Sequence, residues 1–178
     1  MGYKITTLKN LPKHLEYYFF LIGDYSNNAL INNFFREEFD IIASRLGEDA
    51  GIISQTRKSK IEHELTMAIN KQIEKHLFSK TALSDFFNSI ERQYPGLLIL
   101  NKHPDNLTDK DTIIHIPFTT LNSVYSNTDE LLTDLVEFTR GNKQLLEKIK
   151  KWIKQNKKII SGVSIGINVG LFSINFEL

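Results

Sequence analysis

Four short runs of apolar and β-branched residues, each bounded by turn-forming residues, constrain the fold of this chain more than any other feature. They occupy residues 17–22, 50–54, 97–100 and 112–118. Their length and their aromatic or β-branched content predict buried strands. Elsewhere apolar residues recur at helical spacing, over residues 29–46, 58–77, 81–93, 129–141 and 142–156. Alternating strands and helices of this kind predict an α/β domain with a sheet flanked by helices.

The third and fourth strands are expected to pair antiparallel. A polar, turn-rich connection at residues 101–111 joins them, and such short connections join antiparallel strands by default. The chain has 178 residues, enough to bury about two thirds of its unfolded surface in one core. We therefore expect one domain, with an α/β core over residues 1–141. Residues 142–178 would add a basic amphipathic helix and a β extension to it.

Composition excludes several kinds of chemistry. The chain has no cysteine, which rules out disulfides, thiol nucleophiles, iron–sulfur clusters and Cys-ligated zinc. It contains 22 Lys and Arg against 21 Asp and Glu, so it is not basic throughout and is not expected to bind nucleic acid. Glycine-rich loops that bind nucleotide phosphates are absent, and no cofactor is expected.

The order strand, helix, strand, helices, strand, strand, helix resembles the thioredoxin fold, in which a βαβ half is followed by a ββα half. The resemblance covers residues 16–141. Pro95 opens the third strand, where that family carries a cis proline beside its active site. The family's cysteine pair would fall on residues 25–28, which read Tyr-Ser-Asn-Asn, and residues 58–77 form an additional helix. The resemblance thus implies a redox-inactive thioredoxin-like core. A flavodoxin-like or Toll/interleukin-receptor-like sheet is the alternative and requires the last strands to be parallel.

Two groups of residues are candidates for a site. Asp24, Tyr25 and Ser26 follow the first strand, at the end of an α/β sheet where ligands tend to bind, although turn formation and helix capping explain them more simply. The second group combines imidazoles and carboxylates, which are ligands for divalent ions. Its members are His103, Asp105, Asp109, Asp111 and His115.

The second group is the basis of one alternative function, metal-assisted hydrolysis. Residues 105–111 fit no calcium loop, because the turn glycine and the terminal Glu of such a loop are missing. Acidic residues in a turn usually face water, and this simpler interpretation is favoured.

Charge is distributed unevenly along the chain. Residues 143–158 contain seven Lys and one Glu, a net charge of +6, and residues 159–178 contain one charged residue, Glu177. The formal charge of the whole chain is +1, so residues 1–142 sum to +1 − 6 + 1 = −4. Lys150, Lys151 and Trp152 lie on the basic helix and are candidate interaction residues.

Three structures are open for the uncharged segment from residue 159 to residue 176. Alternating apolar and small or polar residues favour a β strand with a bend. A membrane helix fits the length and the four-residue spacing of Gly162, Gly166 and Gly170, but its Ser and Asn residues oppose insertion. Stacked fibrous assembly is the third alternative.

The predicted function is a non-enzymatic protein-interaction or assembly module, a homo-oligomer formed through the C-terminal strand. A prokaryotic signalling or defence system is the suggested context. No export signal is recognised, so a cytoplasmic location is expected. The alternatives are the metal-assisted hydrolase and a protein that associates with membranes through its C-terminal segment.

Overall fold

The structure is a computed structural model of the whole chain. It describes residues 2–5, 7–23, 29–37, 39–55, 63–65, 67–68, 71, 95–107, 111–155 and 167–168.

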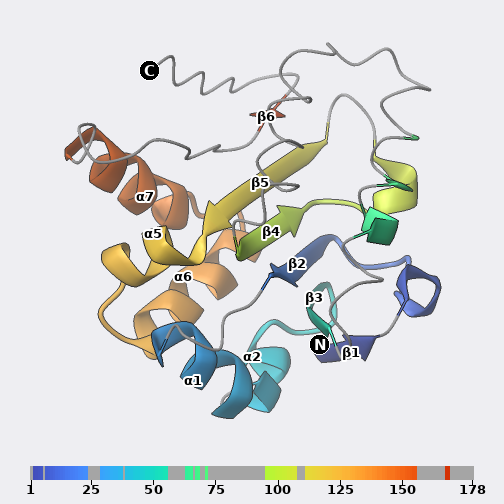
Figure 1. Cartoon of the computed structure of the whole chain (residues 1–178), viewed down its shortest axis with the longest axis horizontal. Coiled ribbons are helices and arrows are strands. Elements are labelled where there is room, and N and C mark those ends of the chain that lie inside the picture. The colour runs from blue at the N-terminus through green and yellow to red at the C-terminus, as the bar shows by residue number, and fades with distance from the viewer. Residues whose placement is uncertain are drawn as a thin grey trace.

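A mixed sheet with the strand order β1-β3-β2-β4-β5-β6 forms the centre of the molecule (Figure 1). The strands are β1 (Gly2–Ile5), β2 (Tyr17–Ile22), β3 (Ala50–Gln55), β4 (Gly96–Leu100), β5 (Thr112–Pro117) and β6 (Ile167–Asn168). Strands β1, β3 and β2 are parallel, whereas β4 is antiparallel to both β2 and β5. The predicted antiparallel pairing is confirmed, which excludes the alternative sheets that require parallel strands here. The α/β class is also confirmed.

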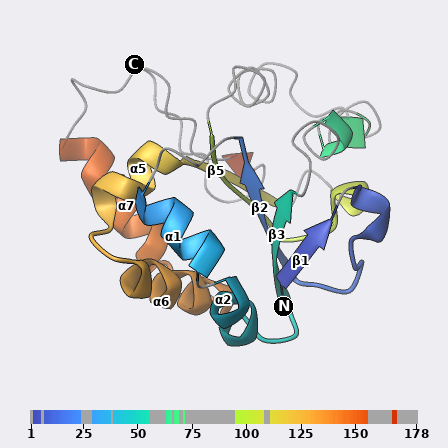
Figure 2. The ribbon, with the colours of Figure 1, turned by 60° about the horizontal axis from the view of Figure 1, so that its bottom comes forward.

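In the described part of the chain, one face of this sheet is covered by helices, as Figures 1 and 2 show. They are α1 (Ala29–Glu37), α2 (Phe39–Arg45), α5 (Phe118–Val124), α6 (Thr128–Thr139) and α7 (Gln144–Gln155). Alternate strand residues such as Phe19, Leu21 and Ile99 point into this core. Leu145 and Ile149 of α7 belong to the same core, so the basic helix packs on the sheet as part of the helix layer.

The opposite face of the sheet carries a second core. Tyr18, Phe20 and Leu98, which alternate with the residues of the first core, pack there. They are covered by the loop before β2, by the short 3-10 helix η1 (Leu8–Asn10), by Leu107 directly after the 3-10 helix η2 (Pro104–Asn106), and by Leu65 of a helical segment. The two-residue periodicity of strands thus produces two cores from one run of apolar residues.

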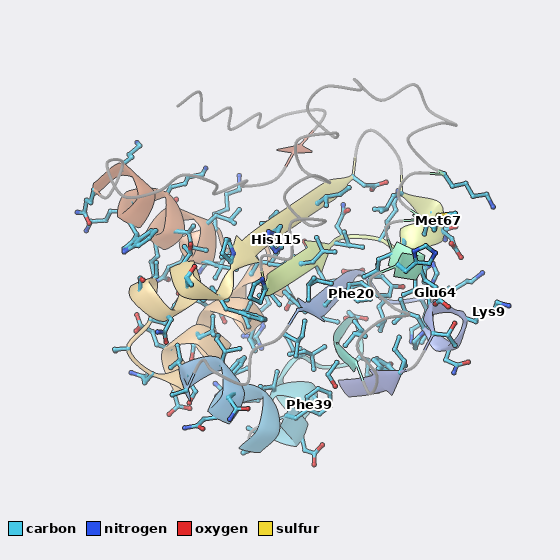
Figure 3. All side chains as sticks on the ribbon, viewed as in Figure 1. Lys9, Phe20, Phe39, Glu64, Met67 and His115 are labelled. Carbon is cyan, nitrogen blue, oxygen red and sulfur yellow. The ribbon has the colours of Figure 1, made fainter. Side chains whose placement is uncertain are left out.

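Glu64 joins that helical segment to η1, and Figure 3 shows it beside this short helix. Its carboxylate accepts hydrogen bonds from the Thr7 hydroxyl at 2.9 Å and the Leu8 N–H at 2.6 Å. Residues 63–65, 67–68 and 71 are helical, as the sequence predicts, whereas the predicted helix at residues 81–93 lies outside the described residues.

The helix predicted over residues 29–46 corresponds to α1 and α2, and residue 38 between them lies outside the described residues. Two elements differ from the sequence-based expectation. Strand β1 was not predicted, because four residues that include a lysine carry little periodic signal. Phe118, expected to end a strand, is the first residue of α5, a helix whose Thr, Asn, Ser and Val have low helix propensity.

The C-terminal segment reaches the sheet through β6. Ile167 lies opposite Ile113, and Asn168 lies opposite Thr112, in an antiparallel pair with β5. The favoured β structure is confirmed at these two residues, and the rest of residues 159–178 lies outside the described part of the chain. Within that described part, no helix combines the length and apolar character needed to cross a bilayer.

Candidate functional site

The end of β2 and the start of β4 approach each other closely at one end of the sheet. Gly23, directly after β2, has a φ of 80°, a conformation that side-chain-bearing residues rarely adopt. A Cβ atom at Gly23 would lie 2.7 Å from the Cα of Pro95, the residue before β4. Glycine is therefore required here both by the backbone conformation and by the contact with Pro95.

His115 of β5 completes this end of the sheet. The residue is 1% exposed, and its ring lies so close to Gly96 that a Cβ atom there would overlap the imidazole. The Pro95 carbonyl also accepts a hydrogen bond from the Phe118 N–H at 2.9 Å, which ties β4 to the start of α5. Figure 3 shows His115 beside the paired strands β4 and β5. Residues from three neighbouring strands, β2, β4 and β5, thus lie in close contact at the sheet end where the sequence predicts a ligand site. They are Gly23, Pro95, Gly96 and His115.

The predicted ligand residues themselves, Asp24, Tyr25 and Ser26, lie outside the described residues. Tyr94 also lies outside the described residues, and the predicted cis bond before Pro95 with it. Among the peptide bonds that the structure describes, none is cis.

His103 lies beyond the other end of β4 and is almost completely buried. Its Nδ1 accepts a hydrogen bond from the Asp105 N–H at 3.2 Å, and its ring meets the edge of the Tyr18 ring at 5.8 Å between centroids. Burial lowers the pKa of His103 below its ordinary value and outweighs the opposing effect of the nearby Asp105 carboxylate. The neutral imidazole acts as the N-terminal cap of η2.

The described members of the predicted metal cluster do not converge. His115 leans over Gly96 at the start of β4, whereas His103 lies past its last residue, Leu100. The Asp111 carboxylate is buried and forms an ion pair with Lys102 at 3.1 Å, and Asp105 is exposed. Asp109 lies outside the described residues. Of the residues that the structure describes, no three His, Asp or Glu side chains are placed to hold a metal ion.

A buried polar cluster that the sequence analysis missed joins α5, α6 and α7. The Tyr125 hydroxyl donates a hydrogen bond to Asp134 Oδ2 at 2.8 Å, and Lys148 Nζ lies 2.8 Å from the same oxygen. Lys148 also forms an ion pair with Glu130 at 2.8 Å. The available signal was Asp134 itself, an acid on the otherwise apolar face of the predicted helix over residues 129–141.

This cluster is suited to anchoring α7 rather than to catalysis. Burial, together with the hydrogen bond to Asp134, raises the pKa of Tyr125 far above its ordinary value, so its hydroxyl stays protonated. Burial alone would lower the pKa of Lys148, but its hydrogen bonds to Asp134 and Glu130 outweigh burial and raise that pKa. Both groups therefore keep their protons at neutral pH, and neither acts as a nucleophile or a base.

The remaining candidate interaction residues are divided between described and undescribed parts of the chain. Trp152 of α7 is half-buried and packs against the first core, Lys151 is exposed, and Lys150 is partly exposed. Gly162, Gly166 and Gly170 lie outside the described residues.

Comparisons with protein-family models, with curated proteins and with solved structures find no match for this chain. The class that the fold defines is an α/β protein with a mixed sheet packed against several helices.

The environment of His103 predicts a specific dependence of stability on pH. Because its folded pKa is lowered, its neutral form contributes full stability above the unfolded value of about 6.5, and this contribution falls as the pH drops below that value. The slope for one such group is at most about 1.4 kcal/mol per pH unit. His103→Asn keeps an acceptor for the Asp105 N–H and does not titrate. Denaturant unfolding at pH 7.5 and pH 5.0 should show a smaller loss in the variant, and equal losses would contradict this account.

Proposed function

We propose that the protein is a non-enzymatic interaction module with a redox-inactive thioredoxin-like core, and that it assembles through its C-terminal strand. Strands β2 and β3 with the helices between them form a parallel βαβ unit. Strands β4 and β5 followed by α5 form an antiparallel ββα unit. These two halves, in this order, and Pro95 before β4 support the thioredoxin-like assignment. The chain has no cysteine, so this core carries no thiol chemistry.

The observation that carries the assembly proposal is the pairing of β6 with β5. Without β6, the outer side of β5 is a sheet edge, and unpaired backbone groups at such an edge recruit a further strand. In the structure, residues 167 and 168 of the same chain begin to cover this edge. The same contacts formed between two chains produce a strand-exchanged oligomer at little energetic cost, because no new interface is required. A cytoplasmic location and a role in signalling or defence stay predictions from sequence.

Proline substitution in β6 tests this proposal in the full chain. Proline has no N–H and disrupts strand pairing, so the double variant Ile167→Pro/Asn168→Pro should prevent β6 from pairing with β5. The matched control Ile167→Val/Asn168→Thr keeps strand-forming residues at both positions. Light scattering across a range of protein concentrations should show an oligomer for the parent and the control, and a monomer for the proline variant. The same mass for all three proteins would contradict the proposal.

A further inference from the structure

One lysine of α7 is held by ion pairs within the fold, and the other three are exposed or partly exposed. Lys148 is bound by Asp134 and Glu130 and lies 5.3 Å from the centre of the Tyr125 ring. We call the other three, Lys150, Lys151 and Lys154, the lysine surface. Two of them are exposed and Lys150 is partly exposed, and none forms an ion pair with a residue that the structure describes. Their charges are therefore available to a partner.

The apolar side of α7 is already used within the fold. Leu145 and Ile149 are 0% and 1% exposed, and Leu146 and Trp152 also pack against the first core. A helix that enters a bilayer interface must bury its apolar side among the lipids, which α7 cannot do while it is folded. The lysine surface is thus limited to electrostatic contact. Figures 1 and 2 place α7 at the margin of the helix layer.

The residues of α7 favour a lipid surface over a nucleic acid. Base recognition uses arginine forks or stacked aromatic rings, but α7 contains no arginine, and its Trp152 packs against the core. Lysines instead act as point charges on long apolar stems, which suits a layer of anionic headgroups. We propose that the lysine surface binds the anionic headgroup surface of a membrane without inserting into it. This inference is independent of the proposed assembly.

The rest of the molecule would orient this contact. Residues 1–142 carry a net charge of −4, so an anionic membrane repels most of the protein and attracts the end that carries α7. Glu147 opposes the attraction locally, because it precedes Lys150 and Lys151 by three and four residues and shares their side of the helix. Removing its charge should strengthen binding.

Vesicle flotation with charge-matched variants tests the inference. The full-length protein should float with phosphatidylcholine vesicles that contain 30% phosphatidylserine by composition, on the order of physiological surface charge. It should not float with pure phosphatidylcholine. In 0.5 M salt, interactions between charges more than roughly 4 Å apart are screened, so binding should be lost. The variant Lys150→Glu/Lys151→Glu/Lys154→Glu should bind at least about tenfold more weakly. Glu147→Gln should bind about twofold to fivefold more tightly.

The control carries the same change in net charge elsewhere. Lys9, Lys13 and Lys71 are exposed and lie outside α7, so their triple replacement by Glu should leave most of the binding intact. Circular dichroism should show the same fold for all variants. The inference is overturned if the parent does not float at low salt, if both triple variants lose binding equally, or if the lysine surface binds duplex DNA but not vesicles.

Discussion

Gly23→Ala is expected to lower the free energy of unfolding by about 3 kcal/mol. Two costs add at this position. A Cβ atom at the φ of 80° strains the backbone by about 1 kcal/mol, and the same atom would lie 2.7 Å from the Cα of Pro95. Because this contact involves backbone, side-chain rotation cannot relieve it, and overpacking costs about 1–3 kcal/mol more. Urea unfolding followed by circular dichroism measures the difference.

Gly47→Ala is the matched control for this prediction. Gly47 has a φ of 73°, but apart from its two chain neighbours no residue that the structure describes has an atom within 4 Å of the position that its Cβ would take. This variant therefore has only the conformational cost, about 1 kcal/mol. If the two variants lose the same stability, β2 and β4 do not approach each other at Gly23 and Pro95, and the candidate site at this sheet end is wrong.

The sequence predicts the strands well where a single residue pattern determines them. The apolar run from Tyr17 to Ile22 coincides with β2, because its residues are buried on both faces of the sheet. Strand β1 has no such pattern, since it consists of four residues and pairs with β3, some fifty positions along the chain. Its existence depends on a distant partner that local sequence does not reveal.

The candidate site is harder to predict from the sequence than the strands, because it depends on tertiary contacts. His103 and His115 are twelve positions apart and look like one cluster, but His103 lies past the last residue of β4, whereas His115 lies within β5, opposite Leu98, with its ring over Gly96. Spacing alone does not distinguish convergence from separation across a hairpin. Likewise the lysines of residues 143–158 look equivalent in the sequence. In the structure, Asp134 and Glu130 form ion pairs with Lys148 and not with the other lysines that the structure describes.

A cysteine pair placed across β5 and β6 is expected to yield a covalent dimer. Thr112 and Asn168 are directly opposed, and opposed residues of antiparallel strands have Cα atoms about 4.5–5.5 Å apart, within the range that a disulfide spans. The parent chain has no cysteine, so Thr112→Cys/Asn168→Cys introduces the only thiols. If the C-terminal strand is exchanged between copies, each disulfide joins two chains. In the control Thr119→Cys/Asn168→Cys, one thiol moves from β5 to an exposed position on α5, away from the pair of Thr112 and Asn168 that the strand register defines.

The most direct test of strand-mediated assembly is therefore the mass of the oxidised Thr112→Cys/Asn168→Cys protein under denaturing, non-reducing conditions. The account predicts a dimer that returns to a monomer on reduction and that is much less abundant in the control. A monomer closed by an internal disulfide would contradict exchange between copies. A monomer with free thiols would contradict the pairing of β6 with β5 itself.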